Sequence, residues 1–259
     1  MRDAAGTLPP DTPPVGWPLT PGTRAAHASE RDGGTPPPDH TPTDTPASTR
    51  EPQMTRRRLE GAAVWVLGEI SRRRWGFRPS ILPDIVEHLG PIRGARWLAR
   101  SAGVYDSTSR ALGSVRTHLV CMTVSQLNGD SYSAYGHAYA MELIYLRRYD
   151  RLFPVDAEAM AGWAGLPRAE LRGRLRDALN GTDLQVELMW VDRTLAFVEG
   201  SQPPIDEDER RVAQLVDIAN IFNAISVATR PPHDQAFSPI NKDVRLKTRL
   251  AALRAAKNS

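Results

Sequence analysis

Two helix signals meet at Asn128-Gly129-Asp130, and this junction constrains the fold more than any other segment. Before it, apolar residues recur at helical spacing through Ser109–Leu127, a pattern typical of a buried helix. Glycine takes the left-handed conformation that ends many helices, and Asp is a favourable N-cap for a following helix. We therefore expect a helical hairpin whose second helix runs from about Ser131 to Arg151.

The other periodic segments after residue 54 also predict helices, and none of them alternates in the manner of a strand. Prolines and capping residues mark several of the expected ends. The expected helices are Leu59–Arg73, Pro83–Leu89, Ile92–Ala102, Asp156–Trp163, Pro167–Leu179, Leu184–Val198 and a long helix from Asp206 to about Thr229. The predicted fold class is all-α, with one domain over residues 54–230 and a C-terminal extension over 231–259 that carries a basic helix.

The first part of the chain has the composition of a disordered segment. Residues 1–53 hold more than half of the 22 prolines, mixed with Thr, Asp, Ala and Gly and with few large aliphatic residues. Such a segment buries too little apolar surface to offset the entropy lost on ordering. We expect a disordered Pro/Thr-rich tail over 1–53. A translation start at Met54 is the alternative interpretation.

Composition excludes several classes of protein. A single cysteine, Cys121, argues against a disulfide-stapled secreted domain, and we find neither an apolar leader nor an 18-residue window suited to span a bilayer. Two arginine runs, Arg56–Arg58 and Arg72–Arg74, bracket the apolar stretch Ala62–Ile70. No known nucleic-acid motif accompanies them, so a solvated helix face is favoured over phosphate contacts. We expect a cytoplasmic protein without nucleic-acid or membrane partners.

The stretch His118–His137, HLVCMTVSQLNGDSYSAYGH, resembles the active-site segment of the AhpD-like superfamily, the alkylhydroperoxidase and carboxymuconolactone decarboxylase group. In its thiol-dependent members, a helix with a Glu precedes a Val-Ser-x-x-Asn-Gly turn and a helix that opens Cys-x-His-Cys-x-x-x-His. Residues Val124–Gly129 and His137 match this pattern. The family's Glu, first Cys, inter-cysteine His and second Cys fall here on His118, Asp130, Tyr132 and Ser133.

The loss of both thiols argues against the peroxidase activity of the family. That chemistry needs a thiolate nucleophile and a resolving thiol. Cys121 lies on the preceding helix, and one cysteine cannot close the disulfide through which the mechanism cycles. We therefore expect no disulfide-cycling hydroperoxide reduction by this chain alone. Cys121 itself is better explained as a small buried apolar residue.

Weaker similarity extends over roughly residues 80–230. Thr194–Phe197 and Ile205–Asp208 are similar to a Leu-Ala-Phe and Val-Thr-Asp-Glu-Asp passage common in the superfamily. The helix Val212–Thr229, with Asn220 and Asn223, stands where the family places an Asn-bearing closing helix. The resemblance thus implies that this helix closes over the motif.

The resemblance also implies that His118, Asp130 and His137 converge at the active site. Independently, Ser133 precedes His137 by one helical turn on the same helix face. In the catalytic interpretation His137 is the main acid or base, Asp130 and His118 set its protonation, Ser133 lies beside it, and Tyr132 contacts substrate. Structural roles are the alternatives: an N-cap for Asp130, a helix-packing histidine for His118 and a core ring for Tyr132.

The leading functional hypothesis is thiol-independent acid–base catalysis, of decarboxylase, lyase or isomerase type, on a small organic substrate. It requires no cofactor, and the resemblance implies a homo-oligomer. One alternative is a non-catalytic, oligomeric or partner-binding member of the fold. The other is a metal-dependent enzyme with His118, Asp130 and His137 as ligands. A cavity lined by these three side chains favours an enzyme, whereas a motif filled by side chains favours the non-catalytic alternative.

Overall fold

The computed structural model describes residues 50–257, with side chains from residue 56 onward, and every regular element in this part of the chain is a helix, without a strand. The prediction of an all-α fold is therefore confirmed. The predicted disordered tail lies outside the described residues up to Arg50, where the first helix begins.

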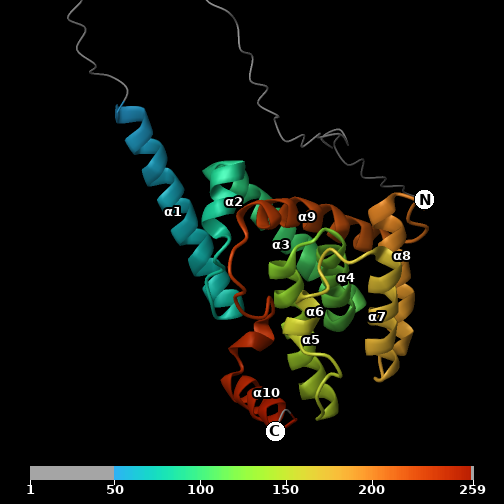
Figure 1. Cartoon of the computed structure of the whole chain (residues 1–259). Helices are drawn as coiled ribbons and strands as arrows, with labels where there is room; N and C mark the ends of the chain where they lie inside the picture. The colour runs from blue at the N-terminus through green and yellow to red at the C-terminus, as the bar shows by residue number, and fades with distance from the viewer. Residues whose placement is uncertain (1–49, 258–259) are drawn as a thin grey trace, which may run out of the picture. The chain divides into compact units, whose positions relative to one another are not determined.

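Figure 1 shows the arrangement of the helices, with the α4/α5 hairpin at the centre and α1 along one edge beside α2. The elements in chain order are α1 (Arg50–Trp75), α2 (Leu82–Leu89), α3 (Pro91–Leu112), α4 (Ser114–Leu127), α5 (Ser131–Tyr149), α6 (Ala157–Ala161), α7 (Arg168–Asn180), the 3₁₀ turn η1 (Gln185–Glu187), α8 (Leu188–Glu199), α9 (Glu207–Thr229), the 3₁₀ turn η2 (Pro239–Lys242) and α10 (Val244–Lys257).

The hairpin is central because neighbours surround both of its helices. All ten residues of α4 from Thr117 to Gln126 are buried. Apolar side chains of α4, α5, α7 and α8 form one core, which includes Leu119, Met122, Met141, Leu171, Leu175, Val191 and Leu195. A second core joins α1 and α2 to Tyr132 of α5, Ile225 of α9 and Phe237 beyond α9. The motif segment therefore lies where the two cores meet.

Several expected helix boundaries are wrong. The first helix begins at Arg50, before the expected start at Leu59 and inside the predicted tail. The sequence predicted one helix over Ile92–Ala102 and the next from Ser109, whereas α3 continues to Leu112 and α4 begins at Ser114. Gly113 separates them at a φ of 85°, a left-handed conformation that suits glycine. Apolar periodicity continues through Gly113, which is why the pattern alone placed the boundary too early.

One helix corrects the expectation that no segment is apolar enough to span a bilayer. Among the described residues, α9 alone is long and apolar enough by length and composition. Its polar residues Asn220, Asn223 and Ser226 lie on one side and bond to the α4/α5 hairpin. These contacts pack one side of α9 against the hairpin, and 33 % of its apolar window is buried inside the described domain.

The segment after residue 230 is integrated with the helical domain. It crosses α5 and continues into η2 and α10, whose Leu246 and Leu250 pack against α5. Within α5, Glu142 is only 3 % exposed and accepts a hydrogen bond from Arg254 of α10 and another, at 2.8 Å, from the backbone N–H of Ala157. An ion pair in the interior thus fixes α10 to the hairpin.

Arg254→Ala should lower the free energy of unfolding by about 3 kcal/mol, because it leaves the Glu142 carboxylate buried without its counter-ion. Arg249→Ala on the same helix is the matched control. Its pair with Asp150 is exposed at both ends, so we expect a loss below about 1 kcal/mol. Urea unfolding of both variants measures the difference, and equal losses would show that α10 is not fixed through Glu142.

Candidate functional site

The turn at Asn128–Gly129 has the geometry that its sequence predicted. α4 ends at Leu127, Gly129 adopts a φ of 75°, and the N–H of Asp130 returns to the carbonyl of Ser125 at 2.8 Å. The Asp130 carboxylate then accepts the backbone N–H of Ser133 at 3.1 Å and caps α5. The predicted helical hairpin is therefore present, with Asp130 as the N-cap of its second helix.

His118 of α4 faces His137 of α5 across the hairpin. Their Nδ1 atoms lie 3.0 Å apart, so one imidazole donates a hydrogen bond to the other. The hydroxyl of Tyr105 on α3 lies 3.1 Å from Nδ1 of His118, and its ring stacks on that of His137. The structure thus brings together the two histidines that the sequence singled out, and it adds Tyr105.

Both imidazoles are held in the neutral form. His118 is 1 % exposed, and burial lowers its pKa to about 3. Burial, followed by the adjacent His118 imidazole, lowers the pKa of His137 well below the usual value. No carboxylate hydrogen-bonds to either ring among the described residues, so no negative charge offsets the cost of burying an imidazolium.

Asp130 does not join the histidine pair. Its Oδ1 accepts hydrogen bonds from the N–H of Ser133 and, at 2.7 Å, from the hydroxyl of Ser226 on α9. Burial raises the pKa of the Asp130 carboxyl, while the bonds from Ser133 and Ser226 act in the opposite direction. The expected convergence of three side chains is therefore seen for His118 and His137 alone.

Polar side chains of α9 hold the hairpin from outside. Asn128 donates to Oδ1 of Asn220 at 2.9 Å, and the Ser125 hydroxyl lies 3.2 Å from Oδ1 of Asn223. Ser226, one turn further on, reaches Asp130. The helix that the resemblance placed over the motif therefore contacts it. Its Ser226 was missed, since a serine in an apolar helix carries no signal of its own.

Three polar side-chain atoms of the motif have no partner in the described part of the chain, and one of them is Oε1 of Gln126. Oδ2 of Asp130 and Oγ of Ser133 are both buried and form no hydrogen bond. Ser133 also makes no hydrogen bond to His137, although the two residues are one turn apart on α5. A buried polar atom without a partner costs roughly 1–3 kcal/mol, so these atoms destabilise the motif.

Tyr132 has a structural environment. It is 2 % exposed, and its hydroxyl donates to Oδ2 of Asp234 at 2.7 Å. Asp234 also accepts the backbone N–H of Ser80 at 2.7 Å, so this tyrosine connects α5 to two distant segments. The aromatic rings of Phe222 and Phe237 flank it. Burial raises the pKa of the phenol, and the expected substrate contact has no open surface here.

Phe237 fills the space beside the motif. Its ring lies against Gly136 so closely that a Cβ there would meet ring carbons at 2.5 Å. The same ring contacts Tyr132 and stands edge-on to His137 at a centroid distance of 5.5 Å. The N–H of Phe237 donates to the carbonyl of Gly136 at 3.1 Å. The glycine in the middle of α5 was the available sequence signal for this close approach, and we missed it.

The remaining candidates do not assemble into a reactive centre. Cys121 is buried among apolar side chains, and burial raises the pKa of its thiol to about 12, far from the range of a reactive thiolate. No three His, Cys, Asp or Glu side chains in the described residues are grouped as metal ligands, so the proposed set of His118, Asp130 and His137 is not gathered. A pocket lies elsewhere, between α1 and α2.

Comparison with known proteins adds no relative to this description. No protein-family model, no curated protein and no solved structure matches the chain.

Gly136→Ala should lower the free energy of unfolding by about 1–3 kcal/mol, because the new methyl group overlaps the Phe237 ring. In a Phe237→Ala background the same change should be neutral or stabilising by up to about 1 kcal/mol, since alanine favours helix more than glycine does. A double-mutant cycle measured by urea unfolding gives the coupling. Additive effects would mean that the ring does not occupy this position.

Stability should fall as the pH drops from about 6.5 toward 3, because the unfolded chain protonates histidines that stay neutral in the folded protein. The folded pKa is the lower one, so the contribution is complete above 6.5 and is lost on acidification. Each such histidine adds a slope of about 1.4 kcal/mol per pH unit. His118→Leu should reduce the slope of stability against pH by the contribution of one histidine. An unchanged slope would contradict the conclusion that His118 stays neutral in the folded protein.

Proposed function

We propose that this chain is a divergent AhpD-like protein that acts by binding and not by catalysis. Three features support the relationship. A helical hairpin turns at Asn128–Gly129, His118 stands opposite His137, and Asn223 of a later helix contacts Ser125. Each of these follows from the motif in the sequence, and the last two join residues that lie on different helices.

The packing of Phe237 carries the proposal of a non-catalytic role. Its ring lies on Gly136 and between Tyr132 and His137, where a substrate would have to approach the motif. The segment that holds it is fixed at Asp234 by Tyr132 and by Ser80. A catalytic pocket is concave and reachable, whereas this motif is filled by the protein's own side chains.

The state of the histidines supports the same conclusion. A general acid or base works best when its pKa lies near the working pH. Burial moves the pKa of His118 to about 3 and that of His137 in the same direction. Neither imidazole therefore supplies a proton near neutrality. Their mutual hydrogen bond and the Tyr105 ring make them part of the helix packing.

Side-chain NMR of the full chain with labelled histidine tests this proposal. The signals of His118 and His137 should stay those of neutral imidazole between pH 5 and pH 8, while the exposed His88 serves as an internal control. His118→Leu and His137→Leu assign the signals. A protonation step of either buried ring inside that range would contradict a packing role and favour catalysis.

Acid–base catalysis on a small organic substrate remains the second candidate, and one observation favours it. Oδ2 of Asp130 and Oγ of Ser133 are buried without partners at the two positions that the motif uses for chemistry. A small carboxylic acid could satisfy both atoms if Phe237 moved aside. Titration of the Phe237→Ala variant with short dicarboxylates, followed by backbone NMR, distinguishes the two candidates. The catalytic candidate predicts chemical-shift changes localised at Asp130 and Ser133, and the non-catalytic proposal predicts none there.

A further inference from the structure

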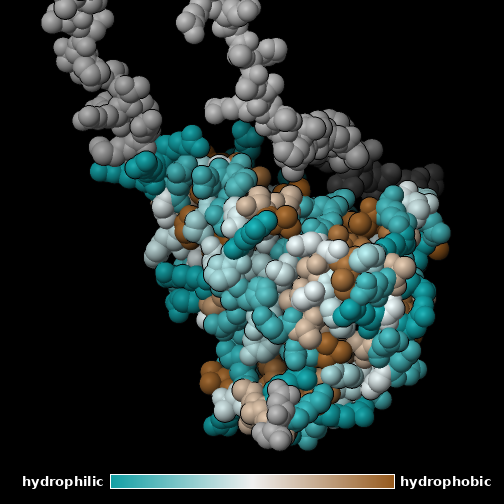
Figure 2. All heavy atoms as spheres, viewed as in Figure 1, coloured by the Kyte–Doolittle hydropathy of each residue, from teal (hydrophilic) through white to brown (hydrophobic). Residues whose placement is uncertain are grey.

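One face of α1 exposes a row of large apolar side chains to solvent. Leu59 is 54 % exposed, Trp65 60 %, Val66 46 % and Ile70 56 %, and with the exposed Ala62 they recur at helical spacing. We call these five residues the outer face of α1. Figure 2 shows apolar atoms that emerge among hydrophilic ones along the edge of the molecule where α1 lies.

The opposite side of α1 is already engaged. Leu67 is buried in the core that α1 shares with α2, and Ala63 and Val64 pack against the same core. α1 is therefore held in place by one side, while the residues of its outer face are exposed and belong to none of the described cores. An apolar row on a convex, firmly held helix marks an interaction surface more strongly than scattered exposed residues do.

Arginines stand at both ends of the outer face. Arg56, Arg57 and Arg58 lie at the N-terminal end of α1, and Arg72 and Arg73 lie at its C-terminal end, all of them exposed. Arg56 and Arg57 line the pocket against α2, and Arg56 pairs with Glu60, so Arg58 is the arginine of this run that adjoins the outer face. From Arg56 to Arg73 is about 26 Å along the helix. The basic residues thus flank the apolar row at both ends and do not interrupt it.

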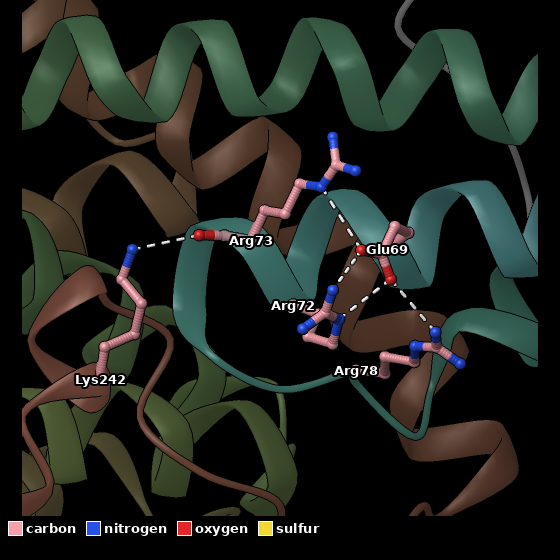
Figure 3. Close-up of polar contacts among 5 residues, drawn as sticks. All are labelled: Glu69, Arg72, Arg73, Arg78 and Lys242. Atoms are coloured by element: carbon pink, nitrogen blue, oxygen red, sulfur yellow. Dashed lines mark hydrogen bonds and ion pairs between the residues drawn. The ribbon is translucent and has the colours of Figure 1, made fainter.

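The acidic residues of this region do not cancel the positive charge. Figure 3 shows Glu69 with guanidinium groups of Arg72, Arg73 and Arg78 around it. Hydrogen bonds from Arg72 lower the pKa of Glu69 to about 2. Lys242 adds a further cation, since its Nζ donates to the carbonyl of Arg73 at 3.1 Å. One carboxylate among four cations leaves this end of the face strongly positive.

We propose that the outer face of α1 binds an anionic membrane surface, with the helix parallel to it. The apolar side chains would enter the interfacial layer, where tryptophan is favoured, and the flanking arginines would meet lipid phosphates. This inference stands independently of the function proposed for the motif. It departs from our expectation of no membrane partner, which rested on the lack of a spanning segment and did not consider peripheral binding.

Charge and shape favour this occupant over three others. A second copy would bring arginines against arginines at the ends of paired α1 helices in either orientation, which is repulsive. A nucleic acid would meet the arginines but leave Leu59, Val66 and Ile70 without an apolar partner. A protein helix is usually received in a groove, whereas the outer face is the convex side of one helix.

Flotation of the full chain with phosphatidylcholine vesicles, with or without 30 % phosphatidylglycerol at low salt, is the direct test. We expect binding only to the anionic vesicles, and release as salt rises. Ile70→Gln should weaken binding about five-fold by the loss of apolar burial, and Arg58→Glu about ten-fold by charge reversal. Thermal unfolding of each variant checks that the fold is retained.

Matched controls lie on other parts of the domain. Ile205→Gln alters an isoleucine that is 78 % exposed before α9, and Arg176→Glu reverses an exposed charge on α7. Both controls should bind vesicles like the unchanged chain. The proposal is overturned if the chain does not float with anionic vesicles, floats equally with neutral ones, or loses binding equally in the controls. In the first case an acidic protein surface becomes the better occupant.

Discussion

The contact between Phe237 and Gly136 is the constraint on which the arrangement of the motif depends. The glycine leaves no room for even a methyl group, because the ring occupies that space. This close approach lets the segment after α9 cross α5, where Asp234 meets Tyr132 and α10 then reaches Glu142. A larger residue at position 136 would separate the C-terminal segment from the hairpin and open the motif.

With the motif closed, its polar residues serve the fold. The side of α9 that carries Asn220, Asn223 and Ser226 satisfies groups at the end of α4 and the start of α5. The two histidines form a hydrogen bond with each other, and burial keeps their imidazoles neutral. The unpartnered side-chain atoms of Gln126, Asp130 and Ser133 are exceptions, and the sequence resemblance aligns the last two residues with the two thiols of the AhpD-like pattern.

Local signals predicted much of this fold, and long-range packing explains what they missed. The Asn128–Gly129 turn and the caps Asp130 and Asp206 are read from neighbouring residues, and both caps accept the expected backbone N–H groups. The approach of His118 to His137 followed from a motif. Tyr105 and Phe237 reach the same site from distant segments, and no periodicity within either segment indicates where its ring lies.

Amide hydrogen exchange at Phe237 tests most directly whether the motif is closed in solution. Its N–H donates a hydrogen bond to the carbonyl of Gly136 in the middle of α5, and most residues around Gly136 on this helix are buried. The account predicts that this amide exchanges as slowly as those in the middle of α5, because both are exposed only when the domain opens. Exchange at the rate of an unprotected loop would mean that the segment leaves α5 freely and that the motif is accessible.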